Sequence, residues 1–252
     1  NTYTGWSNCS APRTEGGYIV GSSTSVPGDT SRAALFWFNA NGIVTNYREL
    51  DLPGQEWIGR QAKQTPDAGY VLCGETSTTG VLDAFLLKTD PDGELEWVRT
   101  FGSENFREGF ATVEVMEDGG FWLGGGKQSS QNNYDPWVVR TDETGTILWQ
   151  NTYGTLGSDP TNAHLTLGST GNGLIATCWN VAPNDISRIA LLALDPDGSV
   201  QWQRLYGPQR NTALFVVQEV TPALDLITCG FAYIGSQPKG ILLRTTATGD
   251  SL

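Results

Sequence analysis

The stretch that decides the fold is Glu117-Asp-Gly-Gly-Phe-Trp-Leu-Gly124, followed by Asp135-Pro-Trp-Val-Val-Arg-Thr-Asp-Glu-Thr-Gly145 and by Ile147-Leu-Trp-Gln-Asn-Thr-Tyr-Gly154. One repeat earlier, the same layout occurs as Pro66-Asp-Ala-Gly-Tyr-Val-Leu72 and Asp83-Ala-Phe-Leu-Leu-Lys-Thr-Asp90. The turn glycines of the successive repeats are separated by 51, 52, 53 and 51 residues, at Gly42, Gly93, Gly145, Gly198 and Gly249. A period near 50 residues is typical of a propeller blade or a similar stacked unit.

Each repeat contains four short segments that we interpret as strands. The third segment is the most apolar, as in residues 189–194, and a continuous apolar run of this length suits a strand buried on both faces. Turns such as Asp90-Pro-Asp-Gly93 join the strands, and we interpret them as turn chemistry rather than calcium loops because no glutamate follows at the twelfth position. The sequence therefore predicts an all-β fold, a single β-propeller domain over residues 1–252 with five blades of four antiparallel strands.

The fifth repeat is incomplete, because it stops at Leu252 where the others continue into a fourth strand. The segment Asn1-Thr-Tyr-Thr-Gly5 is similar to Asn151-Thr-Tyr-Gly154 and could supply the missing outer strand. Alternatively, the natural chain continues beyond Leu252. In either case we expect a closed ring of five blades.

The charge of the chain excludes some classes of partner. The formal net charge is -12, which repels phosphate backbones, so we expect no nucleic-acid binding and interpret the acidic surface as a source of solubility. No apolar run approaches the roughly 20 residues that cross a bilayer, so we expect no membrane insertion.

Four cysteines are present, Cys9, Cys73, Cys178 and Cys229, and none has C-x-x-C spacing. The sequence gives no support for a zinc site, and we expect no metal or cofactor. Cys73 and Cys229 occupy the same place in repeats that are not adjacent, so they should not be bridged. We expect buried thiols, with Cys9 and Cys229 as the pairing to test first.

Two of the four connections in each repeat are long and differ between repeats, and both should emerge on the same face. Binding residues are expected on such a variable face. It combines aromatic, amide and charged side chains, which suit a glycan or a protein partner. The candidate binding residues are Trp57, Glu56, Arg107, Glu108, Asn162, His164, Arg210 and Asn211.

Some aromatic residues are better explained by packing. The tryptophans of the fourth strand, Trp97, Trp149 and Trp202, recur at one position, with Tyr47 placed as their counterpart in the first repeat. We predict that they pack between blades rather than bind a ligand. His164 is the only histidine and follows the register of Trp57 and Phe110, so we interpret it as a replacement for a structural aromatic rather than a catalytic base.

These units resemble those of a broad group of secreted bacterial repeat proteins. The resemblance is carried by Glu15-Gly-Gly-Tyr-Ile-Val-Gly21, Asp83-Ala-Phe-Leu-Leu-Lys-Thr-Asp90 and Ile147-Leu-Trp-Gln-Asn-Thr-Tyr-Gly154, and it covers nearly the whole chain. It implies a β-propeller with an extracellular or cell-surface location. Most members of the group have no assigned activity.

Two functions follow as hypotheses. The first is a non-enzymatic extracellular or cell-surface propeller that binds a glycan or protein partner, or is a subunit of a surface assembly, through its variable face. The alternative is a glycoside hydrolase or lyase with a carboxylate pair near the central channel. The candidate carboxylates for this alternative are Glu114, Glu219, Glu56 and Glu108.

Overall fold

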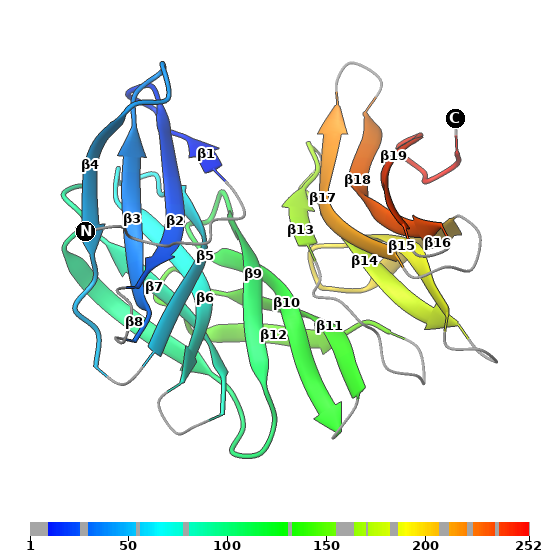
Figure 1. Cartoon of the computed structure of the whole chain (residues 1–252), viewed down its shortest axis with the longest axis horizontal. Coiled ribbons are helices and arrows are strands. Elements are labelled where there is room, and N and C mark those ends of the chain that lie inside the picture. Colours follow the sequence, from blue (N-terminus) through cyan, green and yellow to red (C-terminus); the bar gives the residue numbers. More distant parts are fainter. Residues whose placement is uncertain are drawn as a thin grey trace. The chain divides into compact units, whose positions relative to one another are not determined.

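The computed structural model describes residues 10–25, 30–53, 56–77, 81–130, 133–154, 164–169, 171–181, 186–206, 212–220, 224–234 and 237–251. These residues form β-strands, turns and connections, and none of them lies in a helix. Accordingly, no helix within this part of the chain is long and apolar enough to cross a membrane. The strands form five antiparallel sheets, the blades of a β-propeller, which confirms the predicted fold class (Figure 1).

Each blade is a meander of strands that are consecutive in the sequence. The first blade contains β1 (Ser10–Pro12), β2 (Tyr18–Thr24), β3 (Arg32–Phe38) and β4 (Val44–Glu49), and the second contains β5 (Glu56–Gln64), β6 (Tyr70–Ser77), β7 (Asp83–Thr89) and β8 (Leu95–Phe101). The third contains β9 (Glu108–Val115), β10 (Phe121–Ser130), β11 (Asn133–Thr141) and β12 (Ile147–Thr152), and the fourth contains β13 (His164–Leu167), β14 (Gly173–Val181), β15 (Ile186–Leu194) and β16 (Val200–Tyr206). The fifth contains β17 (Thr212–Val220), β18 (Asp225–Ile234) and β19 (Gln237–Thr245).

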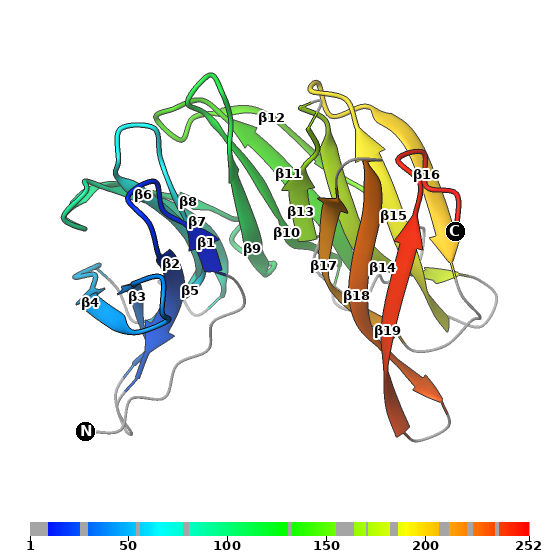
Figure 2. The ribbon, with the colours of Figure 1, turned by 90° about the horizontal axis from the view of Figure 1, so that it is seen from above.

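The fifth blade has three strands in the described part of the chain, and Figure 2 shows β17, β18 and β19 side by side. This agrees with the incomplete fifth repeat of the sequence. The segment Asn1–Gly5, which we considered as its fourth strand, lies outside the described residues.

The chain divides into two compact units, Asn1–Leu123 with Thr141–Thr146, and Gly124–Arg140 with Ile147–Leu252. In the first unit, Ile19, Leu35, Leu72 and Phe85 belong to one buried apolar cluster. The second unit has its own cluster, and its members include Leu174, Ala176, Leu191, Ala193 and Val217. A single domain over residues 1–252 stays a prediction.

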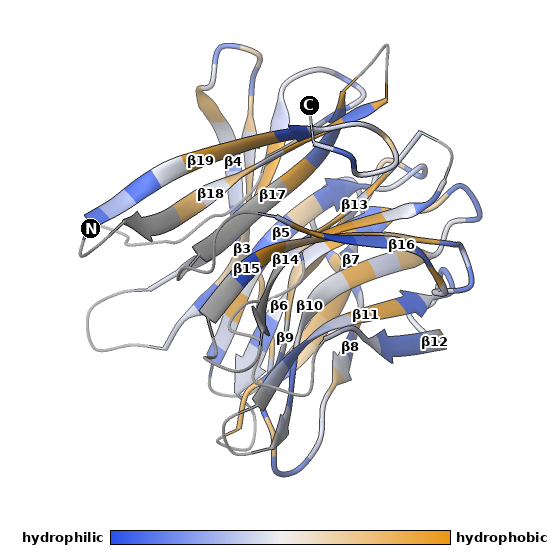
Figure 3. Cartoon of the chain, turned by 90° about the vertical axis from the view of Figure 1, so that its right-hand side faces the viewer, coloured by the Kyte–Doolittle hydropathy of each residue, from blue (hydrophilic) through white to orange (hydrophobic). Residues whose placement is uncertain are grey.

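Burial changes systematically across a blade. All residues of β7 but the first are buried, because apolar side chains on both of its faces meet other blades or strands. The outer strand β12 is exposed at every position except Trp149, and it is mostly blue in Figure 3. These strands show the pattern of the four-stranded blades, in which the third strand belongs to the core while the fourth faces solvent.

The tryptophans of the fourth strands explain the turn glycines. A Cβ atom added to Gly145 would lie 3.0 Å from the Trp97 ring, and one added to Gly198 would lie 2.9 Å from the Trp149 ring. Trp202 approaches Gly249 in the same way. In each case the indole covers the turn of the following blade, so the prediction that these tryptophans pack between blades is confirmed.

The first blade makes the same contact with a different residue. Asn46, four residues after Gly42, occupies the strand position of the tryptophans, and Trp37 lies opposite it on β3. Trp37 then reaches Gly93, where an added Cβ would lie 2.8 Å from its ring. Placing Tyr47 as the counterpart of the tryptophans was therefore wrong by one residue; Tyr47 is 52 % exposed and stacks on Phe36.

The cysteines agree with the sequence in part. Neither Cys73, which is buried, nor Cys229, which is partly buried, forms a disulfide bond. The bridge between Cys9 and Cys229 that we set out to test is therefore not formed. Cys9 and the side chain of Cys178 lie outside the described residues.

The contact between indole and glycine can be separated from the backbone cost of the turn. Gly42 and Gly198 hold the same turn position, with φ of 75° and 84°, but an added Cβ meets nothing within 4 Å at Gly42. We expect Gly42→Ala to cost about 1 kcal/mol, from the left-handed backbone alone. Gly198→Ala should cost about 1–3 kcal/mol more, because its methyl group overlaps Trp149. Urea denaturation of both variants checks this, and equal losses of stability would contradict the packing role of the indole.

Candidate functional site

The meander topology separates long connections from short turns. In the second blade, β5 begins, β6 ends, β7 begins and β8 ends at one end of the sheet, and β9 of the next blade begins there. We call this the loop end, because the connections from β6 to β7 and from β8 to β9 lie there, and we call the opposite end the turn end. Loops supported by rigid strands commonly carry binding and catalytic residues.

Glu108 is the first residue of β9 and lies at the loop end. Its side chain is only 2 % exposed, and the hydroxyl group of Ser103 donates a hydrogen bond of 2.8 Å to its Oε1 atom. Its backbone N–H donates to the carbonyl of Leu82 at 2.8 Å. These contacts fix the position of Glu108 relative to both connections of the loop end.

Glu75, near the end of β6, lies against the start of β9. A Cβ atom added to Gly109 would lie 2.6 Å from Cγ and 2.8 Å from Oε1 of Glu75, so glycine is required there for the carboxyl group to fit. The guanidinium group of Arg60 lies 3.2 Å from the same Oε1 atom. Both side chains of this ion pair are partly buried, at 26 % and 13 % exposure for Arg60 and Glu75.

A third carboxyl group, Asp83, begins β7 and is partly buried. Burial disfavours its charged form and raises the pKa of its carboxyl group above the ordinary value. Its Oδ1 atom would be 2.0 Å from a Cβ atom on Gly102, which follows β8. We refer to Glu75, Asp83 and Glu108 as the loop-end carboxylates.

Glu75 and Asp83 were not among the candidates from the sequence. Both lie in strands, Glu75 in β6 and Asp83 in β7. The sequence contains one signal for Glu75: this charged residue directly follows the apolar run Tyr70-Val-Leu-Cys-Gly74. The contact with Gly109 of the next blade could not be read from the sequence.

Glu114 lies at the opposite end of its strand. It forms an ion pair with Lys63, near the end of β5, and both side chains are largely buried. Six residues separate Glu108 from Glu114 in β9, which corresponds to roughly 20 Å along a strand. These two candidates therefore do not come together, since paired carboxyl groups in glycosidases lie only ~5–9.5 Å apart.

Glu219, in the second unit, also has a structural partner. Its Oε1 atom accepts a hydrogen bond of 3.1 Å from the backbone N–H of Ser169, in the turn after β13. In the first unit, Gln64 accepts a bond of 2.8 Å from the N–H of Thr14 in the same way. Both residues tie a turn to the first strand of the following blade.

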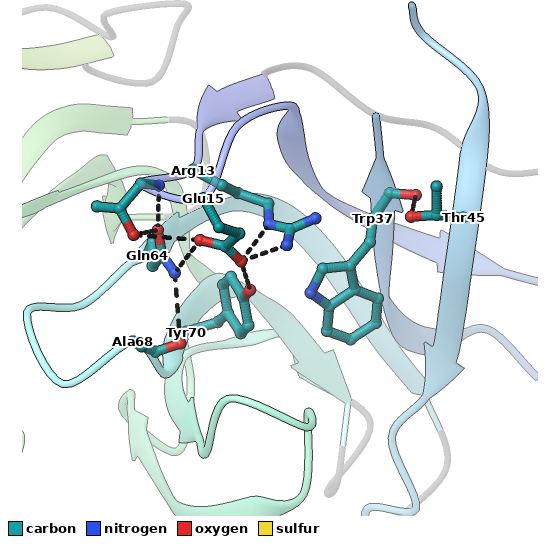
Figure 4. A network of polar contacts seen from close by, with 8 residues as sticks. Arg13, Glu15, Trp37, Thr45, Gln64, Ala68 and Tyr70 are labelled. Atoms are coloured by element: carbon teal, nitrogen blue, oxygen red, sulfur yellow. Dashed lines mark hydrogen bonds and ion pairs between the residues drawn. The ribbon is translucent and has the colours of Figure 1, made fainter. Parts of the chain in front are cut away.

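The network around Gln64 shows how charged groups are used at the turn end (Figure 4). Glu15 accepts a hydrogen bond of 2.8 Å from Nε of Arg13 and one of 3.0 Å from Nε2 of Gln64. The Arg13 bond is the main cause that lowers the pKa of the Glu15 carboxyl group to about 2. Glu15 is therefore ionised throughout the physiological range and holds the turn in place.

The remaining candidates of the first unit are spread over the loop end. Trp57 is 4 % exposed, donates from Nε1 to the carbonyl of Pro53 at 2.9 Å, and contacts Phe85 edge to face. Glu56 is partly buried, and Arg107 is exposed on the loop before β9. Trp57 thus offers little surface to a ligand, while Arg107 is accessible. Asn162, Arg210 and Asn211 lie outside the described residues.

His164 begins β13 in the second unit and pairs with Ala176 across the sheet. Its Nδ1 atom is buried and has no hydrogen-bond partner among the described residues. Burial lowers the pKa of the imidazole to about 4, so the ring is neutral at pH 7. This environment suits a packed aromatic ring, as the register with Trp57 and Phe110 suggested.

The described residues contain no group of three or more His, Cys, Asp or Glu side chains arranged to hold a metal ion.

No family model and no curated protein matches the sequence. Solved structures share its fold at low identity. An endo-arabinase from Bacteroides thetaiotaomicron VPI-5482 has a TM-score of 0.52 and 9 % identity, over 93 % of this chain and 91 % of that chain. A Synechocystis apocarotenoid oxygenase has a TM-score of 0.54 and 12 % identity, over 94 % of this chain and 57 % of that chain. A mannose phosphorylase from Leishmania mexicana has a TM-score of 0.44 and 13 % identity, over 95 % of this chain and 83 % of that chain.

These comparisons correct our first functional hypothesis, the non-enzymatic binding propeller. The fold is similar to that of an endo-arabinase over nearly the full length of both chains. The sequence alone could not decide between the two hypotheses, because its repeats are informative about the scaffold and not about the function.

The buried imidazole predicts a pH dependence of stability. The folded-state pKa of His164, about 4, is below the ordinary value of 6.5, so the unfolded chain binds the extra proton between these values. The contribution of the neutral His164 ring to the free energy of unfolding is fully present above pH 6.5, and it is lost as the pH falls towards 4. At pH 4.5 the loss should be about 2 kcal/mol.

The variant His164→Phe should lack this loss. Unfolding by urea at pH 7 and pH 4.5 measures it as the difference between wild type and variant, because titrating carboxyl groups affect both proteins equally. Identical pH dependence in the two proteins would show that the imidazole is not held neutral in the fold.

Proposed function

We propose that this protein is a glycoside hydrolase that cleaves a polysaccharide at the loop end of the second and third blades, with Glu75 and Glu108 as its carboxylate pair. The observation that carries the proposal is that Glu75 packs against Gly109, the residue next to Glu108. Glu75 packs on the side of β9 toward which a Cβ atom of Gly109 would point, and the side chain of Glu108 points to the other side because side chains alternate along a strand. Standard bond lengths limit the distance between the two carboxyl groups to roughly 12 Å. This range includes the spacing of ~5–9.5 Å found in retaining and inverting glycosidases.

The two carboxyl groups have different surroundings, as this chemistry needs. Glu75 has its negative charge compensated by Arg60, which suits the partner that acts as an anion on water or on the sugar. Glu108 is almost fully enclosed and holds a hydroxyl partner, Ser103, which suits the proton donor to the leaving oxygen. Asp83, with its raised pKa, is a third acidic group at the same end.

The comparison with the endo-arabinase supports the proposal at the level of the fold, which a sugar-cleaving enzyme shares over 93 % of this chain. We extend the proposal to the substrate class, a polysaccharide, and to an extracellular or cell-surface location. The location is supported by the resemblance of the repeat units to those of secreted bacterial propellers.

The proposal predicts the effect of removing either carboxylate. Glu75→Gln and Glu108→Gln should each lower the release of reducing ends from polysaccharides by about 10²- to 10⁴-fold, the usual contribution of an acid or base. Arabinan, β-mannan and levan are suitable first substrates.

Glu94→Gln is the matched control, because Glu94 is 64 % exposed and pairs with Arg48 at the turn end. It should keep the wild-type rate. Melting temperatures of all three variants establish that they are folded. The proposal fails if the wild-type protein releases reducing ends no faster than the Glu75→Gln, Glu108→Gln double variant on every substrate.

A further inference from the structure

The first unit contains a groove of about 510 Å³ at the turn end, away from the loop-end carboxylates. It lies between the β5–β6 turn and strand β8 on one side and the turns of the third blade on the other. Its volume is within the range of ~300–1,000 Å³ that is typical of small-molecule sites. The proposed catalytic chemistry does not use this groove.

One wall of the groove is aromatic. The rings of Trp97 and Phe121 lie 6.1 Å apart between centroids and are tilted by 56°. The guanidinium group of Arg99 lies 5.5 Å from the centre of the Trp97 ring. The contact with Gly145 holds Trp97 in place, so this wall exists before any ligand binds.

The polar groups of the groove lie beside Trp97, since Lys88 is its cross-strand partner, and their charges are compensated. Lys88 is only 9 % exposed, and its ammonium group lies 2.7 Å from Asp67 and 2.6 Å from Glu96. An ammonium group has three donors, and in the described part of the chain these two carboxylates are its acceptors. The third donor remains available to a ligand, and the carboxylates can accept further hydrogen bonds.

This combination selects the chemistry of the occupant. An anion is disfavoured, because Lys88 is already shared by two carboxylates and the protein carries a net charge of -12. A cation is disfavoured because Arg99 already places a positive charge 5.5 Å from the centre of the Trp97 ring. An uncharged molecule with many hydroxyl groups fits, since its C–H surface can pack on Trp97, the partly exposed ring, while hydroxyls bond to Lys88 and the carboxylates.

We propose that this groove binds an uncharged sugar segment of the polysaccharide, as a second carbohydrate site distinct from the loop end. The choice of ligand rests on the proposed function. The site itself rests on the aromatic wall, the buried ammonium group and the volume of the groove.

A blocking substitution tests the groove without removing its packing. Thr144 lines the groove, is exposed, and precedes Gly145 in the turn. Asn41 precedes Gly42 in the equivalent turn of the first blade, where open space surrounds the glycine. Thr144→Trp should fill the groove. Asn41→Trp places the same side chain at the equivalent turn of the first blade, outside the groove.

Both substitutions are made in the Glu108→Gln protein, so that the polymer is not consumed, and binding is measured by affinity electrophoresis and calorimetry with arabinan, β-mannan and levan. We expect Asn41→Trp to bind like its parent and Thr144→Trp to weaken the affinity for the bound polymer at least 10-fold. Glu143→Ala, at an exposed residue of the same groove, should weaken it about 3-fold. Polygalacturonate, a charged polymer, should bind more weakly than the neutral polymers.

The inference is overturned if both groove variants bind like Asn41→Trp, or if the Glu108→Gln protein binds none of the neutral polymers. Failure of the catalytic proposal gives a different result, because Glu75→Gln and Glu108→Gln would then leave hydrolysis unchanged whatever the binding data show.

Discussion

The structure depends on the contact between the indole of one blade and the turn glycine of the next. The glycine has a left-handed backbone, and its missing Cβ atom leaves the space that the ring occupies, as at Gly145 and Trp97. A change on either side disturbs the other, so the position of the turn relative to the neighbouring fourth strand is fixed. This accounts for the near-constant period of 51 to 53 residues and for the short, similar turns at one end of the blades. The connections at the other end are under no such constraint, and there the repeats differ.

The same constraint decides how polar residues are used at the two ends. At the turn end, charges and amides mainly fasten neighbouring blades, as in the bonds of Gln64 to Thr14 and of Glu219 to Ser169. These interactions add net stability of about 0.5–1.5 kcal/mol each, and more when one partner is charged. At the loop end, Glu75 and Glu108 are enclosed near connections that have no repeated packing role. Burying carboxyl groups is costly, and this cost supports the role that we propose for them.

Much of the fold could be predicted from the sequence, because period, turn residues and apolar strands are local signals. Gly93 and Gly145 were sufficient to place the turns, and the spacing of the repeats was sufficient to predict the blades.

The site could be predicted only in part. Glu108 was found because it directly follows a variable loop, whereas Glu75 gains its meaning from Gly109 in another blade. The partner of Glu114 was missed for the same reason, since nothing local shows that Lys63 reaches it. In the first blade, Trp37 on the third strand takes the packing role that a fourth-strand tryptophan has in the other blades. Only the strand register shows this exchange.

The loop-end carboxylates and the turn-end groove are connected by the same strands. β5 and β9 contain nine and eight residues, so the two ends lie on the order of 25 Å apart along rigid, hydrogen-bonded segments. This distance is too large for direct electrostatic coupling at physiological ionic strength, where charges more than ~8 Å apart are largely screened. A small sugar could not contact both places, but an extended polymer could. Cooperation between the two ends would then arise from effective concentration, with the groove holding a chain whose distant part reaches the carboxylates. On this argument the groove affects the use of long polymers and leaves the chemistry at Glu75 and Glu108 independent of it.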